Sequence, residues 1–156
     1  MNSTSLQIPL ADEAATLTLG AAIAPHFLPG MFITLTGDLG AGKTTLTRGV
    51  LRGLGYTGRV KSPTYTLVEL YVFSRLNLYH FDFYRLLDRE EWHEAGFRDL
   101  FNETNVCLVE WPEKAHGELS PPDLAIHLAI TGESRVATLT AHSVQASLLV
   151  AALTNP

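Results

Sequence analysis

The chain has 156 residues, of which 46% are hydrophobic and 17% are charged. This balance is typical of a folded globular protein and argues against a disordered chain. The formal net charge is -5, whereas a protein that holds nucleic acid alone carries a basic patch to neutralise phosphates. If RNA takes part in the function, we therefore expect a partner to hold it. The length fits one domain, residues 1–156.

The location of the protein is predicted from what the sequence lacks. Residues 1–10 have neither the basic nor the apolar segment of a signal peptide, and no apolar stretch is long enough to cross a membrane. We expect a cytoplasmic protein. The single cysteine, Cys107, lies in an apolar run and is predicted to be a buried thiol in a reducing compartment.

The first half of the chain reads as strand and helix in alternation. Thr4–Leu10 alternates weakly and favours an edge strand. Asp12 is a candidate N-cap for a helix over Glu13–Ala24, which Pro25 ends. The apolar run Met31–Thr36 predicts a buried strand, and after a glycine-rich stretch a helix is expected over Thr45–Leu54, closed by Gly55.

The second half begins with β-like segments over Thr64–Tyr71 and Leu76–Phe83, joined by polar residues. Asp88, with Glu91 three residues later, predicts a helix that runs to Ala95 and stops at Gly96. A further buried strand is expected at Val106–Glu110, and the final predicted elements are a hairpin and a helix. They are the strands Leu124–Ile130 and Arg135–Ala141, and the helix Val144–Leu153 capped by Ser143.

Alternating strands and helices predict an α/β fold of the P-loop NTPase type. We expect a mostly parallel central sheet, flanked by helices, with an antiparallel hairpin at one edge.

The glycine-rich stretch matches the pattern Gly-x4-Gly-Lys-Thr in full. Its residues are Gly37, Asp38, Leu39, Gly40, Ala41, Gly42, Lys43 and Thr44. Glycines let successive backbone N–H groups turn towards an anion, and the helix that follows adds its positive end. Lys43 is expected to reach the β- and γ-phosphates of a nucleotide, and the Thr44 hydroxyl to bind Mg²⁺. The alternative is a chance match in a glycine-rich turn, but an apolar strand precedes the stretch and a helix follows it.

The nucleotide is predicted to be ATP. A GTPase would carry an Asn-Lys-x-Asp motif to read guanine and an Asp-x-x-Gly switch, and the chain has neither. Asp82 and Glu110 each end an apolar segment, which is where P-loop proteins place an acid near the metal. Either acid alone could be a solvated strand end. Two such acids in one P-loop domain favour a metal and water site.

Two further segments have both a functional and a plain interpretation. Lys61-Ser62-Pro63-Thr64-Tyr65 follows the P-loop helix, where such proteins keep a switch loop, and the Thr64 hydroxyl could sense γ-phosphate or Mg²⁺. It could equally be a simple loop before a strand. Trp111 follows Glu110 and is either a packing residue or a neighbour of the phosphates.

Four motifs occur in order and together resemble the TsaE (YjeE) family, the ATPases of bacterial tRNA threonylcarbamoyladenosine synthesis. They are Gly-Asp-Leu-Gly-Ala-Gly-Lys-Thr-Thr (37–45), Lys-Ser-Pro-Thr-Tyr-Thr-Leu-Val-Glu (61–69), His-Phe-Asp-Phe-Tyr-Arg-Leu (80–86) and Leu-Val-Glu-Trp-Pro (108–112). The P-loop alone is common to many families, whereas its combination with the second and fourth motifs is specific. The resemblance covers about residues 6–150.

The resemblance implies a small cytoplasmic ATPase, dependent on Mg²⁺ and weak until its partners stimulate it. Those partners, the TsaB–TsaD heterodimer, transfer the threonylcarbamoyl group to tRNAs that read codons beginning with A. The TsaE subunit performs no transfer and acts as a turnover switch, so it meets tRNA only through the complex.

The same resemblance implies roles for individual residues. Lys43, Thr44 and Thr45 belong to the phosphate loop, Glu110 resembles the family's metal-associated acid, and Asp82 its second essential carboxylate. Trp111 resembles its companion tryptophan. Glu13 and the Gly132–Arg135 turn, with Arg135, resemble segments that approach the base and the ribose.

Two other functions remain open from the sequence. A small-molecule P-loop kinase would need an acceptor pocket and several arginines in a lid, and residues 84–113 contain only Arg85, Arg89 and Arg98. The second alternative is a nucleotide-binding module that docks on a partner protein without hydrolysing the nucleotide.

Overall fold

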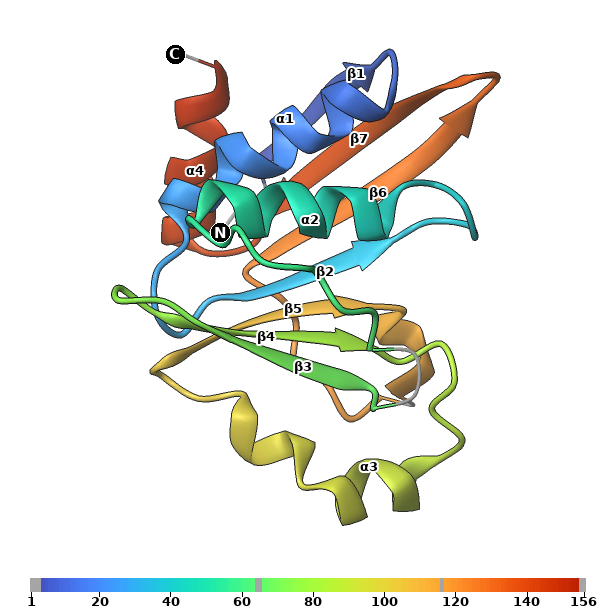
Figure 1. The fold of residues 1–156 in the computed structure, drawn as a ribbon, viewed down its shortest axis with the longest axis vertical. Coiled ribbons are helices and arrows are strands. Elements are labelled where there is room, and N and C mark those ends of the chain that lie inside the picture. Colours follow the sequence, from blue (N-terminus) through green and yellow to red (C-terminus); the bar gives the residue numbers. More distant parts are fainter. Residues whose placement is uncertain (1–3, 64–65, 116, 155–156) are drawn as a thin grey trace.

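A computed structural model describes residues 4–63, 66–115 and 117–154. Within these residues seven strands form one sheet in the order β1-β7-β6-β2-β5-β4-β3 (Figure 1). The strands are β1 (Thr4–Leu10), β2 (Phe32–Thr36), β3 (Val68–Val72), β4 (Asn77–Asp82), β5 (Asn105–Glu110), β6 (Leu124–Thr131) and β7 (Ser134–Ala141). The helices are α1 (Glu13–Ile23), α2 (Lys43–Gly53), α3 (Arg89–Ala95) and α4 (Val144–Thr154), with short 3-10 turns η1 (Ala24–His26), η2 (Phe97–Leu100) and η3 (Pro112–Ala115).

The centre of the sheet is parallel, as expected for strands joined by crossover segments. β2 pairs in parallel with both β5 and β6, and β4 pairs in parallel with β5. The carboxyl ends of these four strands therefore lie at one edge of the sheet, on the right of Figure 1. This edge is referred to below as the carboxyl edge.

The predicted antiparallel hairpin forms and Thr4–Leu10 is an edge strand as predicted, but the position of the hairpin at the edge of the sheet was wrong. The hairpin β6–β7 lies inside the sheet, because β1 adds antiparallel to β7 and becomes the edge strand. At the other edge β3 and β4 also pair antiparallel, since a short turn joins them. β3 begins at Val68, later than predicted, because Leu67 has a φ of 66° and cannot continue an extended strand. Of the predicted start of this strand, Thr64 and Tyr65 lie outside the described residues.

Local capping signals in the sequence were confirmed. The Asp12 carboxylate accepts the N–H of Ala15, and Asp88 accepts the N–H of Glu91 in the same way. The Ser143 hydroxyl accepts the N–H of Ala146, and Gly96 ends α3 in the left-handed conformation. Helix α2 starts at Lys43, two residues before its predicted start, because Gly42 is its N-cap.

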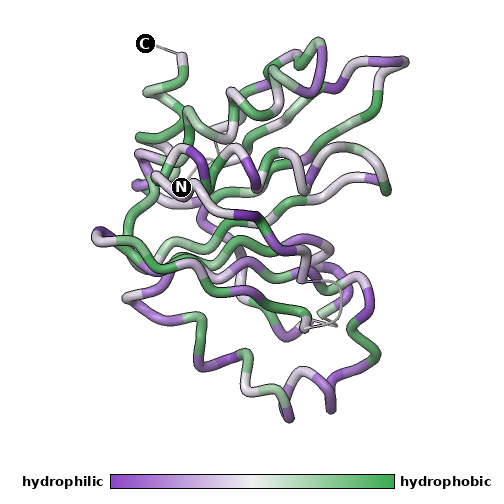
Figure 2. Tube along the Cα trace, viewed as in Figure 1, coloured by the Kyte–Doolittle hydropathy of each residue, from purple (hydrophilic) through white to green (hydrophobic). Residues whose placement is uncertain are grey.

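Each face of the sheet packs against its own hydrophobic cluster. Along β5, Val106 and Leu108 join a large cluster with residues of α1, α2 and α4, whereas Cys107 and Val109 join an aromatic cluster with Trp92 and its neighbours from residues 84–119. This alternation is the period of two expected for a strand covered on both faces. Hydrophobic green accordingly follows the central strands in Figure 2. Cys107 is buried, as predicted.

Helices α1 and α2 approach each other through glycines. A Cβ atom built on Gly49 of α2 would lie 2.3 Å from the carbonyl oxygen of Leu17, and one on Gly20 of α1 would lie 2.4 Å from that of Leu46. Both distances are far below a van der Waals contact, so the helix backbones touch directly. This contact sets the position of α2, and therefore of Lys43 and Thr44 at its start.

Candidate functional site

The glycine-rich loop joins the end of β2 to the start of α2 at the carboxyl edge. Gly37, Gly40 and Gly42 have φ values of 144°, 82° and 108°, in the region that favours glycine. A Cβ atom on Gly37 would also lie 2.6 Å from the carbonyl oxygen of Leu128. The loop thus needs glycine at these positions, and it ends at a helix N-terminus, the arrangement that binds anions in proteins.

Lys43 lies inside this loop and is 5% exposed. Its ammonium donates to the carbonyl oxygens of Gly37 at 2.5 Å and Asp38 at 3.0 Å. The same nitrogen lies 4.3 Å from the centroid of the Trp111 ring, within the range of a cation–π contact. Burial lowers the pKa of Lys43, although the charges of Glu110 and Asp82 act in the opposite direction. The lysine is therefore held in place between the loop and the two acids.

Asp82 and Glu110 lie side by side at the ends of β4 and β5. The two residues are partners in the parallel register, so both face the side of the sheet that carries the loop and α2. Glu110 is 3% exposed, which excludes the interpretation of a solvated strand end. Asp82 is half-buried, and its Oδ1 accepts the N–H of Tyr84 at 3.0 Å. Burial raises the pKa of Asp82, and the neighbouring Glu110 adds to this effect, while the Tyr84 N–H opposes it.

His80 is the remaining polar residue of this cluster, and it was not predicted from the sequence as a site residue. It is fully buried on β4, and its Nε2 lies 2.6 Å from Oε2 of Glu110. The signal in the sequence was its position two residues before Asp82, because side chains two apart on a strand share a face.

Trp111 has a backbone φ of 57°, which is rare for a residue other than glycine. Its ring packs against the ring of Tyr84 at a centroid distance of 4.9 Å. The Lys43 ammonium contacts the same ring. The choice left open by the sequence is thus partly resolved: the ring packs, and it does so directly beside the loop lysine.

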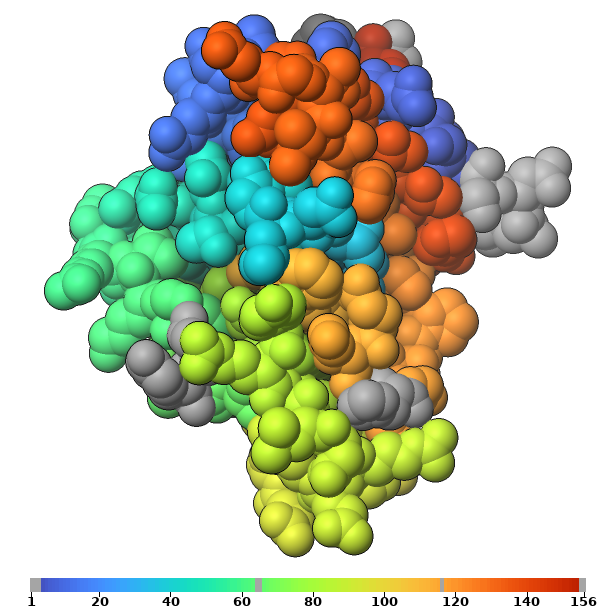
Figure 3. All heavy atoms as spheres, turned by 90° about the vertical axis from the view of Figure 1, so that its right-hand side faces the viewer, coloured from blue at the N-terminus to red at the C-terminus, as the bar shows by residue number. Residues whose placement is uncertain are grey.

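The residues expected on the base and ribose side also gather at the loop. A small cavity of about 180 Å³ is lined by Glu13, Thr45, Arg135 and the loop residues Gly40, Ala41 and Gly42, among others. Arg135 donates to the carbonyl oxygen of Gly40 at 3.2 Å, and Glu13 lies 3.7 Å from Arg48 of α2. Figure 3 looks onto this edge, where the loop, the start of α1, the β6–β7 hairpin and the segments after β4 and β5 meet.

Four of the expected loop residues are exposed: Asp38, Leu39, Gly40 and Thr44. Among the described residues the Thr44 hydroxyl has no hydrogen-bond partner. Thr64, the proposed sensor of γ-phosphate, lies outside the described residues.

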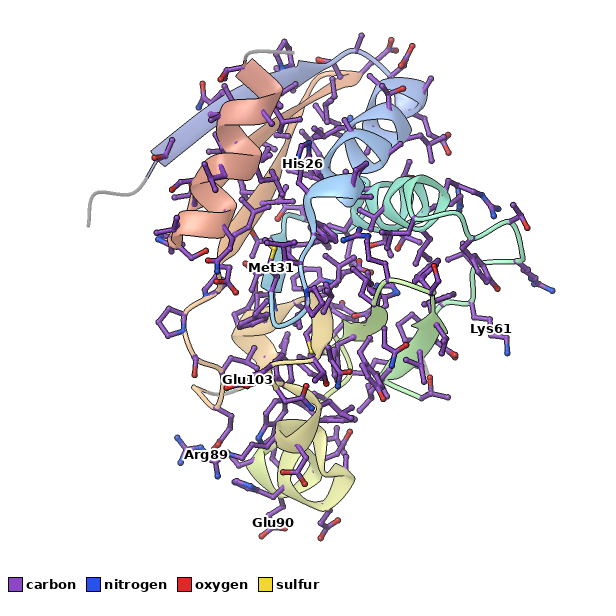
Figure 4. The ribbon with its side chains drawn as sticks, turned by 90° about the vertical axis from the view of Figure 1, so that its left-hand side faces the viewer. His26, Met31, Lys61, Arg89, Glu90 and Glu103 are labelled. Carbon is purple, nitrogen blue, oxygen red and sulfur yellow. The ribbon has the colours of Figure 1, made fainter. Side chains whose placement is uncertain are left out.

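A larger cavity of about 640 Å³ lies at the opposite, amino edge of the sheet. Met31 and Glu103, both on its lining, are labelled on this side of the molecule in Figure 4. Several polar groups of the cavity are already used within the protein: Asp123 accepts the N–H of Phe32, and Asn105 donates to the carbonyl of Leu100. The cavity therefore belongs to a different part of the molecule from the loop and its acids.

Residues 4–63, 66–115 and 117–154 contain no group of three or more His, Cys, Asp or Glu side chains arranged to hold a metal ion. No helix in these same segments is long and apolar enough to span a membrane.

The chain is similar to known proteins over most of its length. Residues 10–138 match the family described as threonylcarbamoyl adenosine biosynthesis protein TsaE. The chain is 42% identical to the tRNA threonylcarbamoyladenosine biosynthesis protein TsaE of Haemophilus influenzae, over 99% of this chain and 100% of that protein. It is also 42% identical to the protein of the same name from Bacillus subtilis, over 83% of this chain and 80% of the relative.

A solved structure shares the fold as well. The crystal structure of Bacillus subtilis YdiB superposes with a TM-score of 0.83 at 32% identity, covering 99% of this chain and 97% of that one. With the family match over most of its length and relatives of this similarity, the chain belongs to the TsaE family of tRNA threonylcarbamoyladenosine biosynthesis proteins.

Proposed function

We propose that residues 1–156 form one P-loop ATPase domain that binds ATP with Mg²⁺ at the Gly37–Thr44 loop. The observation that carries the proposal is the placement of Asp82 and Glu110 at adjacent strand ends, on the face of the sheet where Lys43 lies. An anion-binding loop alone would support nucleotide binding. Two carboxylates beside it supply what hydrolysis needs in addition: groups that orient metal-bound water and the attacking water.

The residues at this edge fit Mg²⁺ as P-loop proteins bind it. Mg²⁺ keeps several water molecules and takes only one or two protein carboxylates, besides phosphate oxygens. The Thr44 hydroxyl, Asp82 and Glu110 would hold the ion, which would neutralise charge on the phosphates. Lys43 would add a second positive charge, and Trp111 would keep it in place.

The base and ribose would lie in the small cavity beside the loop. Glu13 and Arg135 line it from two separate elements, and Arg135 is anchored on the loop through Gly40. Thr64 completes the proposal as the residue that reads the γ-phosphate.

In the cell we propose that this ATPase serves the TsaB–TsaD heterodimer in the threonylcarbamoyladenosine modification of tRNAs that read codons beginning with A. It would act in the cytoplasm, be weak alone and stimulated by the complex, and switch it between turnovers without transferring the group itself. The relatives are named for this pathway. The acidic net charge of -5 favours docking on proteins over direct contact with tRNA.

Reconstitution tests the proposal. The chain, the two partners, tRNA and ATP are combined, and modified tRNA and released inorganic phosphate are measured. Lys43→Ala is expected to abolish ATP binding, and Glu110→Gln to reduce phosphate release about 100-fold or more while ATP still binds. Modification at the normal multiple-turnover rate without this chain, or with Lys43→Ala, would contradict the proposal. Transfer of phosphate to a metabolite would instead indicate a small-molecule kinase.

A further inference from the structure

His80 is buried without full use of its polar atoms. Its side chain is fully buried, and its Nε2 lies 2.6 Å from Oε2 of Glu110. Among the described residues, His80 Nδ1 is the one buried side-chain nitrogen or oxygen that lacks a hydrogen-bond partner. A buried polar atom without a partner destabilises the folded state. An apolar side chain of similar size would avoid this cost but could not form the hydrogen bond to Glu110. That hydrogen bond is therefore the contribution specific to the imidazole.

The contact occupies one specific oxygen of Glu110. Oε2 accepts from His80, whereas Oε1 has no hydrogen bond to any described residue. A glutamate side chain has three rotatable bonds, and one anchored oxygen restricts all of them. Burial lowers the pKa of Lys43, and among the carboxylates that oppose this shift Glu110 has the largest effect. The anchored carboxylate therefore lies close enough to Lys43 to act on its charge, and no described residue occupies its second oxygen.

We propose that His80 is a positioning residue, whose Nε2–H holds Oε2 of Glu110 so that Oε1 is presented to the water and metal shell at the phosphate loop. This inference rests on the proposed ATPase function and adds to it a residue that touches neither nucleotide nor metal. It follows the general design in which an outer hydrogen bond fixes the orientation of an inner ligand.

Three substitutions separate this role from a merely structural one. In His80→Gln the amide nitrogen is as many bonds from Cα as Nε2, so it can donate to Glu110. In His80→Asn the amide nitrogen corresponds to Nδ1 and falls short, and His80→Leu has no donor. His26→Leu is the matched control, because His26 is exposed on the amino side of the molecule, where Figure 4 labels it.

Turnover and nucleotide affinity are measured for each variant with the full chain and its partner complex. We expect kcat for ATP hydrolysis to fall about 10- to 100-fold in His80→Asn and His80→Leu, with the Kd for ATP changed less than about threefold. His80→Gln is expected to stay within about fivefold of the unsubstituted chain. Adding His80→Leu to Glu110→Gln should cause little further loss, because His80 acts through Glu110.

Crystal structures of the variants give a readout that does not depend on activity. We expect Glu110 to keep its position in His80→Gln and to move or adopt several conformations in His80→Leu. An unmoved Glu110 in His80→Leu would overturn the inference, as would equal losses of kcat in His80→Gln and His80→Leu. An unsubstituted chain that hydrolyses no ATP with its partners would overturn the proposed function instead, and the Glu110 conformation would still decide the role of His80.

Discussion

The close contact between α1 and α2 predicts whether replacing a glycine by alanine raises or lowers the free energy of unfolding. In an isolated helix, alanine is more favourable than glycine by about 1 kcal/mol. In this chain, a Cβ atom on Gly49 would lie 2.3 Å from the backbone oxygen of Leu17, against about 3.4 Å for an ordinary contact, so the helices would have to separate by about 1.1 Å. Overpacking of this kind costs up to about 3 kcal/mol, because a backbone atom cannot turn aside as a side chain can. We therefore expect Gly49→Ala to lower the free energy of unfolding by about 2 kcal/mol.

Urea unfolding of both chains, followed by circular dichroism, measures this difference. Thr18→Ala, on the exposed side of α1, is the control for adding alanine to a helix and should leave stability nearly unchanged. Since α2 also carries Lys43 and Thr44, we expect Gly49→Ala to weaken binding of a non-hydrolysable ATP analogue in calorimetry. A Gly49→Ala chain that is more stable than the parent, by the 1 kcal/mol that helix propensity alone provides, would refute the close contact.

Three further predictions follow from the site and its surroundings. Burial raises the pKa of Asp82, so the charged form of this carboxylate destabilises the folded chain at neutral pH. Asp82→Asn should therefore raise the midpoint of urea unfolding while it lowers ATP turnover. A lower midpoint would contradict this prediction. Burial raises the pKa of the Cys107 thiol to about 12 from 9.0, so the unfolded chain loses its proton first and stability falls as pH rises through this window. At pH 10.5 the loss is about 2 kcal/mol relative to pH 7, and Cys107→Ala should lack that part of the decline. Arg135→Ala removes the hydrogen bond to Gly40 at the rim of the small cavity and should weaken ATP binding about fivefold without a measurable change in unfolding; unchanged affinity would remove Arg135 from the site.

The parts of the fold that the sequence predicted are those decided by neighbouring residues. The caps at Asp12, Asp88 and Ser143 each join a side chain to an N–H three residues later, so their signals are local. The phosphate loop is local as well, because its glycines and Lys43 are consecutive. These features hold wherever the segment is placed in the fold.

The parts that the sequence did not predict depend on pairing between distant segments. The hydrogen bond between His80 and Glu110 requires β4 and β5 to be neighbours in one particular register, although the residues are 30 positions apart. The edge position of β1 was predicted, whereas its pairing with β7 was not, because these two strands lie near opposite ends of the chain. Leu67 and Trp111 have positive φ values although neither is glycine, so their residue types do not predict this backbone conformation. Tertiary contacts impose these conformations on the chain.

The position of Lys43 has a consequence for the energetics of ligand binding. Its ammonium already has two carbonyl acceptors, Gly37 and Asp38, and an aromatic ring as its third neighbour. Phosphate oxygens that reach it must replace these partners, so binding is an exchange of hydrogen bonds and not an addition of new ones. The heat released through this lysine should consequently be small, and displaced water and counter-ions would then supply much of the driving force.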